Sequence, residues 1–371
     1  MSRQVLRKQI DTVPSHSRPI ELAELERPAL EGELAARGRE RFHARQIFQW
    51  IYRRGVTRAE GMTDLSRELR ATLASEFTLA TPTIATRETS SDGTEKFLIR
   101  LADGRQIESV FIPDTPAMTF CISTQVGCAM ACAFCLTGKM GLVRNLTAGE
   151  IVGQVRVLAN ALDMRDKPFN IVLMGMGEPL HNYDDTMKAL RILTDEHGFA
   201  VSPRRITLST VGLLPALEQL AKEPVMPNLA ISLHAPTDAV RGELVPLNKK
   251  YGVADIIKTC QRLPVRKRSR ITFEYVLLAG VNDSPADARA LAKLLAGVKS
   301  KVNVIPLNAA AGIPFDRPSD ETIDRFAQIL SERGVFVSVR KSRGRDIRAA
   351  CGQLIVEGQK KSAAQQFAVM L

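Results

Sequence analysis

From residue 118 onward, short apolar runs alternate with longer stretches of helical periodicity, and this alternation restricts the possible folds more than any other feature. Strands are expected at 118–124, 170–174, 205–209, 229–234, 272–278, 301–307 and 335–339. Helices are expected between them, at 148–162, 184–194, 214–222, 286–295 and 320–333. Such alternation is typical of parallel β/α units. The sequence therefore predicts an α/β fold, an open partial (β/α)6 barrel with its chemistry at the carboxyl ends of the strands.

Two regions of a different pattern precede this alternation. Helices are expected at 21–37, with a break or restart at Pro28, and at 43–54 and 66–77. Alternating residues at 96–101 and 107–112, joined at Asp103 and Gly104, predict a β-hairpin. The predicted organisation is a flexible tail at 1–19, a helical domain at 20–80, a barrel with its preceding hairpin at 81–345, and a C-terminal segment at 346–371.

The charge balance favours a polyanionic partner. The chain has 51 Lys and Arg against 40 Asp and Glu, a formal net charge of +11, which suits nucleic acid or an anionic membrane surface, although a merely basic protein would look the same. Arginines and aromatic residues share the stretch 37–58, so its helices are either a nucleic-acid-docking module or a bundle with a solvated basic face. No run reaches the ~18 apolar residues of a membrane span, and the first twenty residues lack a signal-peptide core. We expect a cytoplasmic protein.

Three of the six cysteines, Cys128, Cys132 and Cys135, lie within eight residues at the spacing C-x3-C-x2-C. Six cysteines are too few for a disulfide scaffold in a chain of this size, so the cluster indicates metal binding or catalysis in a reducing compartment. Three thiolates can ligate three irons of a cubane cluster and leave the fourth open to S-adenosylmethionine. Zinc is the main alternative, although neither a second cysteine pair nor a nearby histidine supplies a fourth ligand. Buried structural thiols are the other alternative.

The cysteine loop, with Phe134 before its last cysteine and the continuations 137–139 and 144–147, resembles the signature of the radical S-adenosylmethionine (radical SAM) superfamily. Further blocks resemble one family within it, the RlmN family of dual-specificity RNA methyltransferases that methylate C2 of adenine. These blocks are 42–51, 125–128, 174–180, 208–212, 232–235 and 343–354. They occur in the family's order from about residue 20 to 355. The resemblance implies a radical SAM partial barrel with a small N-terminal helical domain and a short C-terminal extension.

The resemblance also implies roles for individual residues. Cys128, Cys132 and Cys135 would hold one [4Fe–4S] cluster, and the contacts to S-adenosylmethionine would come from Gly177, Glu178, Ser209, Ser232, Leu233, His234 and Asn308. A glycine turn after a strand allows backbone to approach a ligand, and Glu178 can accept hydrogen bonds from an amino group. The alternatives are a surface acid at Glu178 and an ordinary turn-forming serine at Ser209. Cys260 matches no catalytic position, and we expect it in the core.

C2 of adenine is an electrophilic carbon that does not attack a methyl sulfonium, so its methylation needs a radical route. The resemblance implies that Cys351 carries the methyl group, that Cys121 resolves the product and forms a disulfide with Cys351, and that Glu108 accepts the proton. A solvent-facing strand acid is the alternative at Glu108. Two S-adenosylmethionine molecules are used per turnover. The implied partners are 23S rRNA, tRNA and an electron donor such as flavodoxin or ferredoxin, with the enzyme a monomer.

Basic segments at 266–270 and 340–348 are expected to hold phosphates near the mouth of the barrel. Two other functions remain open. One is the related Cfr-type methyltransferase, which modifies C8 of the same rRNA adenine and would share the cluster and both additional cysteines. The other is a non-catalytic RNA-binding protein with a structural metal site.

Overall fold

The computed structural model describes residues 19–113 and 118–356, so the predicted tail at 1–19 lies almost wholly outside it. Within those residues the main sheet has ten strands, in the order β14-β13-β12-β11-β10-β9-β6-β5-β4-β3. The strands from β6 to β14 along this order are parallel and correspond to all the predicted barrel strands. Their bounds are β6 (Thr119–Cys121), β9 (Asn170–Leu173), β10 (Ile206–Thr210), β11 (Asn228–Ser232), β12 (Ile271–Leu277), β13 (Ser300–Pro306) and β14 (Val337–Val339).

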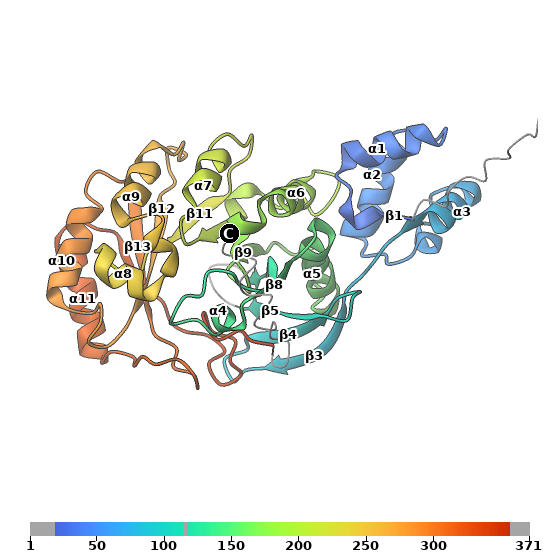
Figure 1. Cartoon of the computed structure of the whole chain (residues 1–371). Coiled ribbons are helices and arrows are strands. Elements are labelled where there is room, and N and C mark those ends of the chain that lie inside the picture. The colour runs from blue at the N-terminus through green and yellow to red at the C-terminus, as the bar shows by residue number, and fades with distance from the viewer. Residues whose placement is uncertain (1–18, 114–117, 357–371) are drawn as a thin grey trace, which may run out of the picture.

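The predicted helices are present between these strands, and they cover the outer face of the sheet (Figure 1). They are α5 (Ala148–Ala161), α6 (Tyr183–Thr194), α7 (Leu214–Leu220), α10 (Pro285–Leu294) and α11 (Asp320–Glu332), joined by α8 (Asp238–Leu244) and α9 (Val253–Arg262). Each buries an apolar stripe against the sheet, as amphipathic helices do. On α9 that stripe includes Ile256, Ile257 and Cys260, which confirms Cys260 as a core residue. Among the described residues β14 and β3 form the two edges of the sheet, so the barrel is open.

The predicted hairpin is also confirmed, as β4 (Glu95–Arg100) and β5 (Gln106–Ile112). An antiparallel β3 (Thr83–Thr89) extends it; its side chains are largely exposed, so it lacked the alternating apolar pattern that would have predicted it. Strand β5 pairs antiparallel with β6, and Val110 faces Cys121 across the ladder. The hairpin therefore joins the barrel sheet directly.

The N-terminal helices form a separate group at the end of the molecule opposite α10 and α11 (Figure 1). They comprise α1 (Arg27–Ala36), α2 (His43–Phe48) with a following π-helical turn, and α3 (Arg67–Glu76). The restart predicted at Pro28 is confirmed, because a short 3-10 turn at Leu22–Glu24 ends before it and Pro28 lies in the first turn of α1, where a missing N–H costs nothing. Short strands β1 (Ile20–Glu21) and β2 (Phe77–Thr78) pair parallel and close the group.

The cysteine loop is enclosed by a small hairpin of β7 (Gln125–Gly127) and β8 (Leu142–Asn145), with α4 (Leu136–Met140) between them. Gly127 has φ +77°, a conformation that side chains with a Cβ rarely adopt. A Cβ there would also overlap the carbonyl oxygen of Gly141. The base of the cysteine loop therefore requires glycine for two reasons, backbone conformation and lack of space.

We predict that Gly127→Ala lowers the free energy of unfolding by about 2–5 kcal/mol, since backbone strain and steric overlap add. Gly104→Ala is the matched control: Gly104 has φ +82° but open space around its Cβ position, so only the strain of about 1–2 kcal/mol applies. Urea denaturation measures both. Equal losses in the two variants would show that the overlap at Gly141 is relieved without cost.

Candidate functional site

One cavity at the carboxyl ends of the parallel strands gathers most of the predicted site residues. It encloses about 930 Å³ of empty space. Its lining includes the three loop cysteines and the predicted ligand-binding residues Gly177, Glu178, Ser209, Ser232, His234 and Asn308, together with Cys351. Leu233 does not line it, because its side chain is fully buried in the core. The strand ends thus bring together side chains that lie far apart in the sequence.

The loop of Cys128, Cys132 and Cys135 is held in a strained conformation. Ala131 has φ +51°, and the Ala133 N–H donates to the Leu244 carbonyl at 3.0 Å, which ties the loop to the end of α8. Burial raises the pKa of all three thiols, that of Cys128 to about 12, so thiolates here require a cation in the cavity. Among the described residues no group of three or more His, Cys, Asp or Glu side chains could hold a single metal ion.

Glu178 is buried on the wall of the cavity, so the alternative of a surface acid is wrong. Its carboxylate accepts N–H groups from Leu180 at 3.0 Å and Val211 at 2.9 Å. Burial nevertheless raises its pKa to about 7. Gln125 accepts the Glu178 N–H at 2.9 Å, and a Cβ on Gly177 (φ +104°) would come within 2.6 Å of the Gln125 side chain. Glycine is therefore required for this close packing.

His234 is neutral and fixed in orientation. Its Nδ1 accepts the Val276 N–H at 3.1 Å, and burial, with a smaller effect from Arg241, lowers its pKa to about 3. The ring makes an edge contact with Phe134 of the cysteine loop, with centroids 4.6 Å apart. Beside it, the hydroxyls of Ser209 and Ser232 lie 3.4 Å apart on β10 and β11. These groups form a polar but uncharged stretch of the cavity wall.

The sequence reasoning missed Arg241, which is fully buried in α8. It donates to the carbonyl oxygens of Val211 at 2.6 Å and Leu233 at 3.0 Å, and so connects the segments that follow β10 and β11. A single arginine in an amphipathic helix carries no sequence signal for this role. Glu274, also missed, is buried and lines the cavity from β12, and burial raises its pKa. Glu274 could have been found in the sequence, because it is a carboxylate within the mostly apolar run 272–278.

Cys121 and Cys351 line a second cavity that adjoins the first. Asn308 Nδ2 donates to the Cys351 carbonyl at 3.2 Å. Arg340 lines both cavities, and the nearby Cys351, Glu274 and Cys121 raise its pKa, Cys351 most strongly. Burial raises the pKa of Cys121 to about 12. The structure therefore places one cation beside both thiols.

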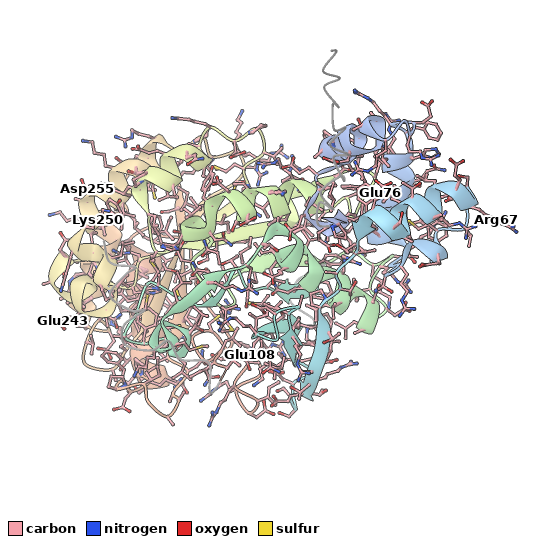
Figure 2. The ribbon with its side chains drawn as sticks, turned by 45° about the vertical axis from the view of Figure 1, so that its right-hand side comes forward. Arg67, Glu76, Glu108, Glu243, Lys250 and Asp255 are labelled. Atoms are coloured by element: carbon pink, nitrogen blue, oxygen red, sulfur yellow. The ribbon has the colours of Figure 1, made fainter. Side chains whose placement is uncertain are left out.

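Glu108 is buried on β5 (Figure 2), so the alternative of a solvent-facing acid is wrong. Its carboxylate pairs with Lys96 at 3.2 Å and accepts the Ile355 N–H at 2.8 Å. Burial raises its pKa despite the lysine. Glu108 lines neither cavity, but Leu354, the residue before its partner Ile355, lines the second.

The two predicted basic segments lie at different ends of the barrel. Arg340 and Arg343 line the second cavity, as expected of residues near the mouth. The prediction for 266–270 is wrong, because these residues precede β12 and lie at the amino end of that strand. Parallel strands place their amino ends at the edge opposite the mouth.

Comparison with known proteins shows which family this chain belongs to. Residues 122–292 match the radical SAM superfamily, and residues 20–79 match the ribosomal RNA large subunit methyltransferase N-terminal domain. The dual-specificity RNA methyltransferase RlmN of Geobacter sulfurreducens is 49% identical over 88% of this chain and 89% of its own length. That of Syntrophotalea carbinolica is 51% identical over 86% and 85%. The chain belongs to the RlmN family.

A solved structure supports the family assignment. The crystal structure of a radical SAM methyltransferase from Sphaerobacter thermophilus shares 49% identity, with a TM-score of 0.86 over 91% of this chain and 99% of that one. The α/β radical SAM fold is therefore confirmed, with the RlmN N-terminal domain before it. No helix in the described part of the chain is long and apolar enough to cross a membrane.

Radical SAM membership implies a [4Fe–4S] cluster and S-adenosylmethionine, and the cavity suits both groups. Three thiols on one loop are the usual ligands of such a cluster. The Asn308 side-chain oxygen is buried without a hydrogen-bond partner among the described residues, so it can accept an N–H group from a ligand. The largely apolar cavity with a few fixed polar groups is typical of a cofactor site.

We predict that Glu178→Gln changes the pH dependence of stability in the protein without bound ligand. The folded pKa is raised to about 7, so between about pH 5 and pH 7 the folded protein retains a proton that the unfolded chain has released. Wild-type stability therefore falls as the pH rises through this range, and glutamine removes that loss. The difference in unfolding free energy, variant minus wild type, should rise by up to about 1 kcal/mol per pH unit.

Urea denaturation at pH 5, 6, 7 and 8 measures this difference. Glu243→Gln, an exposed position on α8, controls for the substitution itself. Parallel pH profiles for wild type and Glu178→Gln would contradict the prediction.

Proposed function

We propose that this chain methylates C2 of adenine in 23S rRNA and in tRNA, with Cys351 as the carrier of the methyl group. The observation that carries the proposal is the convergence of the three-cysteine loop, Cys351 and Cys121 on two adjoining cavities. A carrier thiol next to a radical-generating site is the arrangement that this chemistry requires. The relatives are dual-specificity RNA methyltransferases, which supports the substrate class.

Within this proposal, Cys128, Cys132 and Cys135 hold the [4Fe–4S] cluster. Glu178 accepts hydrogen bonds from the amino group of S-adenosylmethionine, and Ser209, Ser232, His234 and Asn308 contact the rest of it, with Leu233 supporting the wall from the core. Together the bound groups supply methyl groups and a 5′-deoxyadenosyl radical that abstracts hydrogen.

In this proposal, two thiols and one carboxylate of the protein take part directly in the reaction. Cys351 takes up a methyl group at sulfur and loses its thiol proton, with the cation Arg340 beside it on the cavity wall. The S-methyl group gives up one hydrogen atom, its carbon bonds to C2, and the adduct then loses one electron together with the C2 proton. Glu108 accepts the C2 proton, which its raised pKa favours, once Ile355 releases its carboxylate. Cys121 attacks the Cys351 sulfur, frees the methylated RNA and forms a disulfide with Cys351.

We assign RNA docking to the N-terminal helical domain, residues 20–80, and methyl transport to the C-terminal segment that begins at residue 346. Phe42 on the N-terminal helices is 54% exposed and lies between the exposed Arg41 and Arg45. Arg54 stacks over the Trp50 ring at 4.0 Å. Arginines interleaved with accessible aromatic rings, such as the exposed Phe42, suit phosphates and unstacked bases.

The function is tested in a strain that lacks the gene. Nucleosides from its 23S rRNA and tRNA are separated and analysed by mass spectrometry and NMR. We expect 2-methyladenosine to disappear from both RNAs and to return with the wild-type gene but not with the Cys351→Ala gene. Loss of 8-methyladenosine instead would identify a Cfr-type enzyme, and unchanged RNA would refute the proposal.

We predict that Cys351→Ala and Cys121→Ala fail in different ways. Cys351→Ala lacks the carrier and gives neither product nor adduct. Cys121→Ala still carries the methyl group and bonds to RNA, but without the resolving thiol it stops as a covalent protein–RNA adduct. Denaturing gels of protein purified with its RNA distinguish the two outcomes. Cys260→Ala, which removes a core thiol outside both cavities, is the control. Normal turnover by Cys121→Ala would overturn the resolving role.

A further inference from the structure

The outer side of the cysteine loop forms a second wall, which faces away from the catalytic cavity. It borders a groove that encloses about 1290 Å³ of empty space. Cys128 and Met130 line both the groove and the catalytic cavity, while Ala129 and Ala131 line only the groove. The loop is therefore a single layer of chain between the two spaces, and Ala131 is exposed on the groove side.

The charged groups that line this groove are basic. Lys139 of α4 and Lys250, which follows the short helix η6 (Pro246–Lys249), are exposed there, and no Asp or Glu among the described residues lines it. Lys250 lies over the ring of Tyr251, with its ammonium 5.5 Å from the ring centre. His181 also lines the groove, but burial lowers its pKa, which favours the neutral ring. Glu243 and Asp255 are exposed on the same edge of the molecule as Lys250 in Figure 2, and neither acid lines the groove.

We propose that this groove is the docking site of a small acidic electron-carrier protein, which reduces the cluster through the Cys128 wall. The inference rests on the proposed function, because only a cluster on the inner side of the loop needs an electron there. The step is a one-electron transfer: the reduced carrier loses one electron, the bound cluster gains it, and no atom or proton moves. An acidic surface matches Lys139 and Lys250, and the aromatic ring of Tyr251, which also lines the groove, provides an apolar contact.

The position of the groove keeps the carrier apart from the RNA. The catalytic cavity must hold the ligand and the target base, so a protein cannot approach the cluster from that side. In Figure 2 Lys250 and Arg67 of α3 lie at opposite edges of the molecule, which separates the groove from the N-terminal helices assigned to RNA. The groove and the N-terminal helices therefore offer separate surfaces to the carrier and to RNA.

The test compares two charge-reversal variants of the cluster-loaded full chain. The groove variant is Lys139→Glu with Lys250→Glu. The matched control is Lys258→Glu with Lys293→Glu, exposed lysines of α9 and α10 that do not line the groove. Each protein is assayed for S-adenosylmethionine cleavage driven by reduced flavodoxin and, separately, by dithionite. Titration calorimetry gives the affinity for oxidised flavodoxin at low and high salt, with and without the cluster.

We expect the groove variant to bind flavodoxin about tenfold more weakly at low salt, with the difference disappearing at high salt. Flavodoxin-driven cleavage should fall in parallel, while dithionite-driven cleavage stays at the wild-type rate. Lys139 also donates to the Gly312 carbonyl, so the single variant Lys250→Glu is used if the double variant loses its dithionite activity.

Two results would overturn the inference: equal flavodoxin responses in the groove and control variants, or loss of RNA affinity with unchanged flavodoxin-driven cleavage. Failure of the proposed function has a different signature, since wild-type protein would then give no 5′-deoxyadenosine even with dithionite.

Discussion

The candidate site depends on the parallel arrangement of the strands from β6 to β14. Because these strands run in one direction, the segments that follow them meet at one edge of the sheet, where Glu178, Ser209 and Asn308 line a single cavity. Backbone N–H and C=O groups at these carboxyl ends of the strands need hydrogen-bond partners. Arg241 supplies them for the segments after β10 and β11, and a neutral His234 accepts the Val276 N–H of β12. The edge is therefore rigid before any ligand binds, which favours precise positioning.

Burial sets the charge state of the site. It raises the pKa of the loop thiols, Cys121 and Glu178, so without ligands this region favours uncharged groups. Arg340 is the cation that lines both cavities, and among the groups that raise its pKa Cys351 and Glu274 have the largest effects. A positively charged cluster or sulfonium would reverse this preference and stabilise thiolates and carboxylates. Ligand binding and ionisation of the site are coupled for this reason.

The segment that carries Cys351 is attached by hydrogen bonds to several distant parts of the chain. Leu136 N–H donates to the Gly352 carbonyl at 2.8 Å, and the Thr137 hydroxyl donates to the Leu354 carbonyl at 2.6 Å, which joins the segment to the end of the cysteine loop. Glu108 holds the next residue from the hairpin. These bonds give the carrier thiol a defined position between cluster loop and hairpin. Leu354 and Val356 also pack in the main hydrophobic core, so apolar contacts fix the segment in addition to these bonds.

Periodicity and spacing in the sequence alone predicted the parallel barrel, its hairpin and the cysteine loop, because these features repeat locally along the chain. Resemblance to a family pointed to Cys121 and Cys351, which no local pattern connects. Only the tertiary structure showed that these two thiols share a cavity, that Glu108 and Glu178 are buried, and that residues 266–270 lie away from the mouth. Arg241 and Arg340 likewise gained their roles from packing. Burial and proximity depend on contacts between residues distant in sequence, and no local pattern records them.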